Sequence, residues 1–223
     1  MKISKSTFEI LQNYSQINEG LVVDEPTCLK TMSVTGSVIS VYDTDEEFPF
    51  FAIWDLQKFN SLISVPGIEN CEFDFKDDHI LISYGSRKIK YEYADASSMP
   101  VFEEMKESNK YKAFNDFDFK FSITAEDIKE IKRISSIFGT NDTLKIEMKD
   151  DIGVLTVFSE KNDTNSDYTI EIDGEGTGIA YLKISDLIML NGDYKANVTE
   201  QMIKFQNINK PLIYFIRTYM IER

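Results

Sequence analysis

Residues 120–138, KFSITAEDIKEIKRISSIF, place an apolar strand, a helix cap and an amphipathic helix in direct succession. The strand ends at Ile123 and is followed at once by polar residues. Thr124 and Asp127 have the spacing of a capping box, in which each side chain satisfies a backbone group at the start of a helix. The stretch therefore predicts a strand that leads without a loop into a helix.

The helix predicted after Thr124 has two faces of different chemistry. Ile128, Ile131, Ser135 and Phe138 recur at helical spacing and predict the face that packs on a sheet. Positions three and four apart are neighbours on a helix, so the opposite face gathers Lys129, Lys132, Arg133 and Ser136. This positive face lies in a chain with 24 Lys+Arg, 38 Asp+Glu and a formal charge of −14. On its own, the pattern is typical of a solvated face paired with Glu126 and Glu130.

The same order of strand, polar cap and amphipathic segment occurs four times. The strands end at Ile3, Ile53, Ile123 and Ile184, and the widest gap is the middle one. Asp55 and Ser185 are good N-cap residues, and Ser6 with Glu9 fits the capping-box spacing. The helices expected from these signals are KSTFEILQNYSQI, WDLQKFNSLI, TAEDIKEIKRISSIF and SDLIML.

Each predicted helix is followed by three short strand-like runs rather than by another helix. After the first come GLVV, TCLKTMSV and SVISVY, and the later repeats have runs of similar length separated by turn-forming residues. Residues 94–116 break this order. The sequence therefore predicts an α+β protein with a first domain at 1–93, a connector at 94–116 and a similar second domain at 117–223, each built from two strand–helix–three-strand units.

Composition restricts the class of protein further. With 223 residues, 42% hydrophobic and 13% aromatic, the chain can form real cores. It has no signal-peptide pattern and no apolar run near the roughly 18 residues of a membrane span. Cys28 and Cys71 are isolated, so we expect reduced thiols in a cytosol-like compartment. The acidic surface disfavours a generic nucleic-acid binder.

Catalytic and metal-binding motifs are weak. The single histidine, His79, has no nucleophile at a suggestive spacing, and we expect it in a turn or on the surface. The acidic run at 43–47 lacks EF-hand spacing and reads as a solvated loop. DGEGTG at 173–178 misses the phosphate-loop and dinucleotide patterns and reads as a turn. We therefore expect no enzyme activity, no catalytic residue, no cofactor and no metal.

In order and repeat pattern, the whole chain resembles the sliding clamps of T-even-type bacteriophages. WDLQKF at 54–59, YADASSMP at 93–100 and AEDIKEIKRIS at 125–135 match the family pattern. The opening stretch, MKISKSTFEILQNYSQINEGL, is the most specific and matches at Lys2, Ser4, Lys5, Thr7, Leu11, Asn13, Ile17, Asn18 and Gly20. The last 50 residues match in pattern rather than identity.

This resemblance implies a ring of six clamp domains made by three subunits, with sheets outside and helices lining the hole. It implies a non-enzymatic processivity factor that encircles duplex DNA without reading its sequence and tethers a replicative polymerase by its C-terminal tail. It also implies an ATP-dependent clamp loader as a partner and the cytoplasm of an infected host cell as the location. The DNA-facing residues would be Lys5, Lys58, Lys129, Lys132 and Arg133.

The cations expected to line the hole are unevenly distributed over the four predicted helices. Gln12 stands where the family pattern has Lys, and the fourth expected helix has no cation beyond the preceding Lys183. An acidic exterior would keep DNA from binding outside the hole.

The resemblance also implies a site for polymerase and loader tails beside the connector. There Met99, Pro100, Val101, Phe102 and Met105 lie among acidic residues, and methionine suits an adaptable surface. Alternatively, Phe102 and Met105 only hold the connector on the domains. Two other functions stay open: a phage structural or interaction protein with duplicated domains that never encircles DNA, and an acidic DNA mimic, which would not need the positive helix face.

Overall fold

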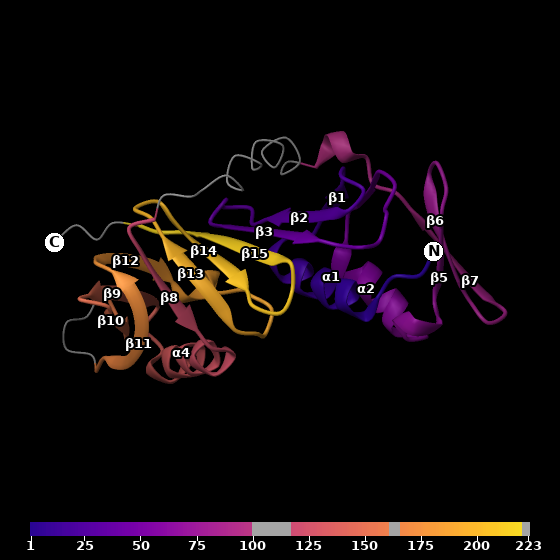
Figure 1. Cartoon of the computed structure of the whole chain (residues 1–223). Helices are drawn as coiled ribbons and strands as arrows, with labels where there is room; N and C mark the ends of the chain where they lie inside the picture. Colours follow the sequence, from indigo (N-terminus) through magenta and orange to yellow (C-terminus); the bar gives the residue numbers. More distant parts are fainter. Residues whose placement is uncertain (100–116, 161–165, 220–223) are drawn as a thin grey trace. The chain divides into compact units, whose positions relative to one another are not determined.

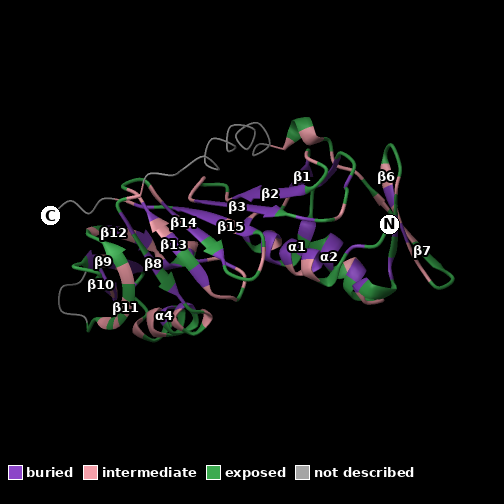
Figure 2. Cartoon of the chain, viewed as in Figure 1, coloured by how far each residue is buried: buried purple, intermediate pink, exposed green. Residues whose placement is uncertain are grey.

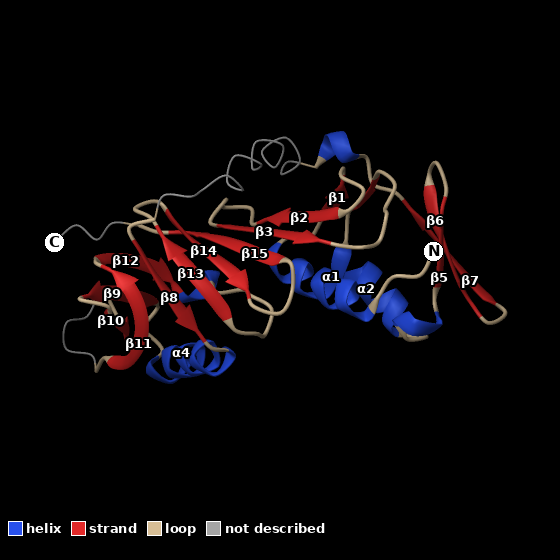
Figure 3. Cartoon of the chain, in the orientation of Figure 1, coloured by secondary structure: helices blue, strands red, loops and turns tan. Residues whose placement is uncertain are grey.

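A computed structural model of the chain describes residues 1–99, 117–160 and 166–219. The chain divides into two compact units (Figure 1). Unit 1 comprises residues 1–35 and 39–110, and unit 2 comprises residues 36–38 and 111–223. Strands are the commonest regular element of the described chain, and helices are few (Figure 3). The predicted boundaries at 1–93, 94–116 and 117–223 stay a prediction, because residues 100–116 lie outside the described residues.

The described part of unit 1 combines two α-helices with short strands. Its elements are, in order, α1 (Lys5–Ile17), β1 (Leu21–Val23), β2 (Cys28–Met32), β3 (Val38–Asp43), β4 (Phe51–Ile53), α2 (Leu56–Ser64), η1 (Ile68–Asn70), β5 (Glu72–Phe75), β6 (His79–Tyr84), β7 (Arg87–Glu92) and η2 (Ala96–Ser98). Strand β1 pairs with β4, β2 pairs with β3, and β5, β6 and β7 form a separate three-stranded sheet. These pairs are all antiparallel.

The two helices of unit 1 pack against each other and bury their apolar faces. The Asn60 side-chain amide on α2 donates to the Leu11 carbonyl on α1 at 2.9 Å. Tyr14, fully buried on α1, donates its hydroxyl to the Leu29 carbonyl on β2 at 3.0 Å. Buried polar atoms must find partners, so these bonds fix the helices to each other and to the strands. Lys5, Gln12 and Gln16 on α1 and Gln57, Lys58 and Ser61 on α2 are exposed.

In its described residues, unit 2 is built around an antiparallel sheet with one long helix. Its elements are β8 (Phe119–Ile123), α4 (Ala125–Phe138), β9 (Thr143–Lys149), β10 (Ile152–Phe158), β11 (Tyr168–Gly176), β12 (Gly178–Lys183), η4 (Ile184–Asp186), β13 (Tyr194–Val198), β14 (Met202–Asn207) and β15 (Leu212–Arg217). The strand order within the unit is β12-β9-β10-β11-β8-β13-β14-β15. Tyr194, Phe205 and Tyr214 are fully buried in its core, with ring centroids 6.0 to 6.5 Å apart.

Helix α4 begins and ends where the sequence predicts. Both halves of the capping box form: the Asp127 backbone donates to Thr124 Oγ1 at 3.1 Å, and the Thr124 backbone donates to the Asp127 carboxylate at 2.9 Å. The helix ends at Gly139, whose φ of 71° lies in the left-handed region that glycine tolerates. Ile128 and Ile131 are buried, whereas Phe138 is only half-buried.

Two details of the predicted repeat are wrong. The fourth expected helix is only the single 3-10 turn η4, and residues 187–190 run on without regular structure. Six residues before Asn191-Gly192 are too few to offset the cost of helix nucleation, and Tyr214 and Tyr194 instead bond the backbone of Leu190. The first expected strand is also missing: Met1 exchanges two backbone bonds with Phe73 of β5, but residues 1–4 form no regular strand.

Candidate functional site

Helix α4 carries the most concentrated positive surface among the predicted site residues. Lys129, Lys132 and Arg133 are all exposed, whereas Ile128 and Ile131 on the same helix are buried. Figure 2 shows α4 with exposed and buried parts. The capped start of the helix and its two buried isoleucines fix the rotation of this face. The structure therefore brings these three predicted residues together on one solvent-facing surface.

The cations of α4 are not neutralised by their own helix. The sequence allowed pairs with Glu126 and Glu130, yet within the described residues Lys129, Lys132 and Arg133 form no ion pair. Glu130 is instead a hydrogen-bond partner of the Tyr168 hydroxyl. Their charge is therefore available to an external anion.

Desolvation acts unequally on these cations. Protein atoms around the Lys132 ammonium displace water and lower its pKa, although the residue is exposed overall. The cause is the loss of hydration of the charged form, and no neighbouring charge contributes. A phosphate would supply the opposite charge that this ammonium lacks.

The two predicted residues of unit 1 lie in the first turns of their helices. Lys5 is the first residue of α1, and Lys58 lies in the first turn of α2, where its backbone donates to the Asp55 cap at 2.7 Å. Both side chains are exposed. Gln12, which replaces the lysine of the family pattern, is exposed on α1. Unit 1 therefore presents one cation on each helix, against three on α4.

Lys183 is engaged elsewhere and adds nothing to a DNA-facing surface. Its ammonium lies 2.8 Å from Glu160 and 3.6 Å from Asp142, and it stacks over the Tyr219 ring at 4.8 Å. Burial alone would raise the pKa of Glu160, but hydrogen bonds from Lys183, Tyr219 and Thr143 lower it to about 2. Desolvation and the Glu160 bond raise the pKa of Tyr219 to about 12. This network holds Tyr219 beside the outer surface of β9 and β12.

The acidic run at 43–47 is not simply a solvated loop. Glu46 accepts from the Ser4 backbone at 2.7 Å and from Thr7 Oγ1 at 2.7 Å, and it also bonds Thr44. Burial raises the pKa of Glu46, but these bonds outweigh burial and lower it. A carboxylate at a helix start also complements the helix dipole. Glu46 therefore fixes the start of α1, where Lys5 lies, a role that sequence spacing did not reveal.

Groups suited to catalysis are not assembled in the described residues. His79 begins β6, and its Nδ1 lies 2.5 Å from the exposed Asp78 carboxylate. No cluster of three or more His, Cys, Asp or Glu side chains suited to a metal occurs in the part of the chain that the structure describes. In those same ranges, no helix has the length and apolar character to cross a membrane.

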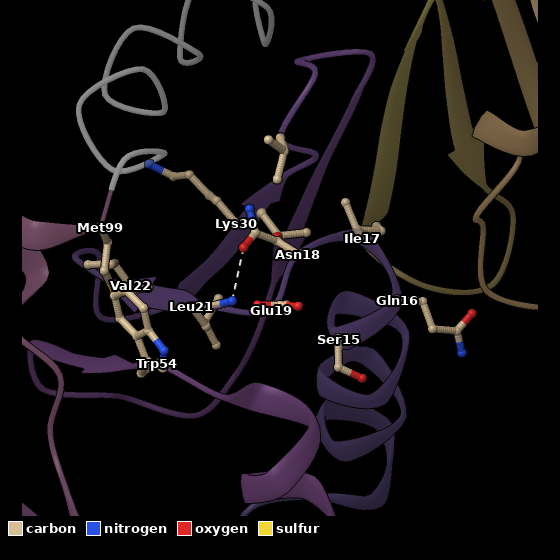
Figure 4. A pocket seen from close by; sticks show the side chains of 13 residues that line it. Ser15, Gln16, Ile17, Asn18, Glu19, Leu21, Val22, Lys30, Trp54 and Met99 are labelled. Atoms are coloured by element: carbon tan, nitrogen blue, oxygen red, sulfur yellow. Dashed lines mark hydrogen bonds between the residues drawn. The ribbon is translucent and has the colours of Figure 1, made fainter.

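Unit 1 also contains a pocket that the sequence did not reveal. A cavity of about 350 Å³ opens between the end of α1, strands β1 and β2, and two later side chains, Trp54 and Met99 (Figure 4). Trp54 is 60% exposed and Val34 is 83% exposed, so both present apolar surface at the opening. Lys30 also lines the cavity, and its buried ammonium pairs with Glu25 and Asp24.

Met99 connects this pocket to the predicted client site. A β-carbon on Gly20 would come within 2.2 Å of the Met99 methyl group, so the glycine leaves room for Met99 to lie against the loop. The other predicted client residues, Pro100, Val101, Phe102 and Met105, lie outside the described residues. Of that predicted set, only Met99 lies in the described residues. The sequence features that could have indicated the pocket are Gly20 and the single tryptophan.

Comparison with known proteins gives a consistent picture, although no protein-family model matches the chain. The sliding clamp of Vibrio phage KVP40 is 27% identical over 225 residues, covering 98% of this chain and 99% of that protein. The sliding clamp of Enterobacteria phage T4 is 26% identical over 202 residues, covering 87% and 86%.

Solved structures show the same fold at low identity. The PCNA of A. fulgidus, solved with a bound C-terminal region of FEN-1, superposes with a TM-score of 0.70 at 9% identity and covers 97% of this chain and 96% of that chain. The PCNA of Entamoeba histolytica gives 0.66 at 11% identity, with 96% and 95% covered. The predicted two-domain α+β clamp fold is confirmed.

Proposed function

The chain belongs to the sliding clamps of T-even-type phages, and we propose from that premise that three copies close head to tail into a ring around duplex DNA. The ring tethers a replicative polymerase and is opened by an ATP-dependent loader in the cytoplasm of the infected host cell. The subunits perform no catalysis themselves. The sliding-clamp names of the phage relatives support the tethering role.

The positive face of α4 is the observation that carries this proposal. Three exposed cations, with no ion pair among the described residues, lie on α4 in a chain with a formal charge of −14. Contacts to phosphates hold a duplex without reading its sequence, and they suit a protein that must slide. The acidic balance of the chain disfavours DNA binding on the outside of the ring. In this role Lys129, Lys132 and Arg133 are the main DNA-facing residues, and Lys5 and Lys58 are minor ones.

The number of subunits follows from the number of clamp domains in each chain and in the ring of the family. Two units per chain and six per ring require three copies, and a head-to-tail contact closes only if two different surfaces of the chain are complementary. Sedimentation at rising concentration should approach three times 25.7 kDa. In a loader-dependent assay, the protein should stay on circular DNA and slide off the free ends of linear DNA. A monomer at high micromolar concentration, or equal retention on both DNAs, would contradict the ring.

The pocket of unit 1 is the proposed client site. Its opening is apolar, its Met99 leads directly into the predicted connector, and a PCNA-fold protein holds the C-terminal region of FEN-1. Extended peptide tails bind by inserting apolar side chains into such hollows. We therefore assign the polymerase C-terminal tail to the cavity between Trp54, Val34 and Met99.

The single tryptophan makes this assignment directly measurable. Binding of a polymerase C-terminal peptide should shift the Trp54 fluorescence, because Trp54 lines the cavity. Val34→Glu should lower the affinity for the peptide by about tenfold, since a charge at the opening opposes the insertion of apolar side chains. Ile179→Glu is the matched control, because Ile179 is 54% exposed on β12 and does not line the cavity. An unchanged affinity for Val34→Glu, or an equal loss for both variants, would place the tail elsewhere.

A further inference from the structure

Four neighbouring strands of unit 2 carry positive charge and no negative charge. Strands β8, β13, β14 and β15 follow one another in the sheet (Figure 1) and hold Lys120, Lys195, Lys204 and Arg217, without an Asp or Glu among their residues. The chain as a whole has 38 Asp+Glu and a formal charge of −14. These four strands are therefore a local reversal of the charge of the protein.

The strand register places three of these cations on one face of the sheet. Asn197 of β13 pairs with Lys120 of β8 on one side and with Lys204 of β14 on the other. Lys195 lies two positions before Asn197, and alternate residues of a strand share a face. Strands lie about 4.8 Å apart and alternate residues about 7 Å apart, so the Cα atoms of the three lysines are separated by about 8 to 10 Å.

This lysine cluster (Lys120, Lys195 and Lys204) projects away from the core. Lys120 and Lys195 are exposed, and Lys204 is half-buried. Phe121 and Phe205, the next residues along β8 and β14, are buried on the opposite face, with ring centroids 6.2 Å apart. The ammonium groups therefore belong to the face of the sheet that is turned away from these rings.

The charge of the lysine cluster is largely unneutralised. Lys120 has one carboxylate neighbour, Glu175 of β11 at 2.8 Å, and both side chains of this pair are more than half exposed. An exposed pair of this kind contributes little free energy and is easily exchanged. Lys195 and Lys204 form no ion pair with any residue that the structure describes. The cluster is therefore able to bind carboxylates from outside the chain.

The neutral neighbours of the lysine cluster are hydrogen-bond donors. Ser122 and Gln206 pair with Lys195 from either side, and both are exposed. Their hydroxyl and amide groups can donate to a carboxylate, as an ammonium does. Phe215, which pairs with Lys204, is buried, so the accessible part of this face lies over β8, β13 and β14.

The chemistry of this face distinguishes between the anions that could bind it. Single-stranded nucleic acid is held by aromatic side chains that stack on its bases, and the accessible face of β8, β13 and β14 has no aromatic residue. Duplex DNA has one charge about every 1.7 Å, and on an open sheet face no ring holds it against the repulsion of an acidic chain. A peptide segment carries fewer charges, and its alternate side chains lie about 7 Å apart when it is extended, close to the spacing of the lysines.

We propose that the lysine cluster docks an acidic, extended segment of a partner protein, with Asp or Glu at alternate positions. The carboxylates of this segment pair with Lys120, Lys195 and Lys204, replace Glu175 at Lys120, and accept hydrogen bonds from Ser122 and Gln206. The site shares no residue with the cavity of unit 1 or with α4. It needs neither the ring nor DNA, so it stands independently of the proposed function.

A synthetic peptide tests the charge complementarity directly. At low salt, a fluorescein-labelled peptide of alternating glutamate and serine should bind the full chain, whereas the same peptide with glutamine in place of glutamate should not. The variant Lys120→Gln, Lys195→Gln, Lys204→Gln should lower the affinity for the glutamate peptide by about tenfold, because three exposed ion pairs are lost. Fluorescence anisotropy measures both effects. No binding to the wild type, or an unchanged affinity in the triple variant, would overturn the proposal.

The cations of α4 supply a matched control. The variant Lys129→Gln, Lys132→Gln, Arg133→Gln removes the same amount of charge, and it should keep the wild-type affinity for the peptide while its retention on circular DNA falls. The lysine-cluster variant should show the opposite pattern. Equal losses of peptide affinity in the two variants would mean that net charge alone attracts the peptide, and lost DNA retention in the lysine-cluster variant would make this face a DNA surface. Either result overturns the proposal.

The peptide measurements decide the site even if the ring does not form. Failure of the wild type to stay on circular DNA would count against the ring and not against the lysine cluster. Carbodiimide, which joins a carboxylate to a lysine ammonium in contact with it, then locates the peptide. Mass spectrometry should find the peptide coupled to Lys120, Lys195 or Lys204 far more often than to Lys149, an exposed lysine of β9. Equal coupling at Lys149 would overturn the assignment.

Discussion

The helices of both units bury apolar residues, but their solvent-exposed faces carry different numbers of cations. Helices α1 and α2 bury apolar residues and expose one predicted DNA-facing cation each, Lys5 and Lys58. Helix α4 buries only Ile128 and Ile131 and exposes three cations within five positions. The fold constrains the apolar spacing of a helix, but it leaves the opposite face free to vary. The packing of the helix therefore does not by itself account for the concentration of charge on α4.

If this difference reflects DNA contact, reversing charge on α4 should have the largest effect. In the variant Lys129→Glu, Lys132→Glu, Arg133→Glu, loading and processive synthesis should fall strongly, because three carboxylates would face the duplex phosphates. The fall should be steeper at low salt, since screening acts over about 10 Å at 0.1 M. The measurement is loader-dependent primer extension at two salt concentrations.

The same variant must keep its fold and mass for the result to count. Exposed substitutions usually change the free energy of unfolding by roughly 0.5 kcal/mol or less, and Lys129, Lys132 and Arg133 are all exposed. The oligomer mass should therefore match the wild type. Wild-type processivity at low salt would refute the DNA-facing assignment of α4.

Unit 1 should respond more weakly to the same treatment. Lys5→Glu with Lys58→Glu reverses two separated charges, so processivity at low salt should fall less than in the α4 variant. Primer extension of both variants in one experiment measures the ratio. A greater loss in the unit 1 variant would invert the comparison and make α1 and α2 the main DNA-facing helices.

Adding charge to unit 1 should make the two sets of helices more alike. Gln12 is exposed on α1, so Gln12→Lys should place a new cation on that helix with little change in stability. We expect slightly longer retention on circular DNA and a stronger salt dependence, because each added phosphate contact steepens the dependence on salt. Retention at several salt concentrations is the readout, and Gln57→Lys on α2 is a comparable exposed substitution.

The smallest effect concerns the titration of α4 itself. Desolvation lowers the pKa of Lys132, so on raising the pH this ammonium should lose its proton earlier than an ordinary exposed lysine. The positive charge of α4 would then decline at Lys132 under alkaline conditions. Titration of the lysine side chains by NMR, with Lys132→Arg to assign the signal, gives the midpoint of this loss. A midpoint in or above the ordinary lysine range would contradict the desolvation of this ammonium.

The charged face of α4 could be predicted because all its determinants are local. The capping box, the isoleucine spacing and Gly139 lie within 16 residues, and each acts through the helix that contains it. The prediction of the fourth helix was wrong because its outcome depends on residues distant in the sequence. SDLIML has a cap and apolar residues, but Tyr194 and Tyr214, from later strands, bond the backbone of Leu190 that a helix would use.

By itself, the sequence determined the repeated order of strands and helices, the two-unit organisation of the fold and the signs of the charges, because periodicity and capping act over a few residues. Tertiary structure alone decided what distant segments build together. The pocket joins residues 15–22, 30–34, Trp54 and Met99, and the Glu46 carboxylate reaches 42 residues back to Ser4. Such sites depend on distances in space, and no pattern along one segment records them.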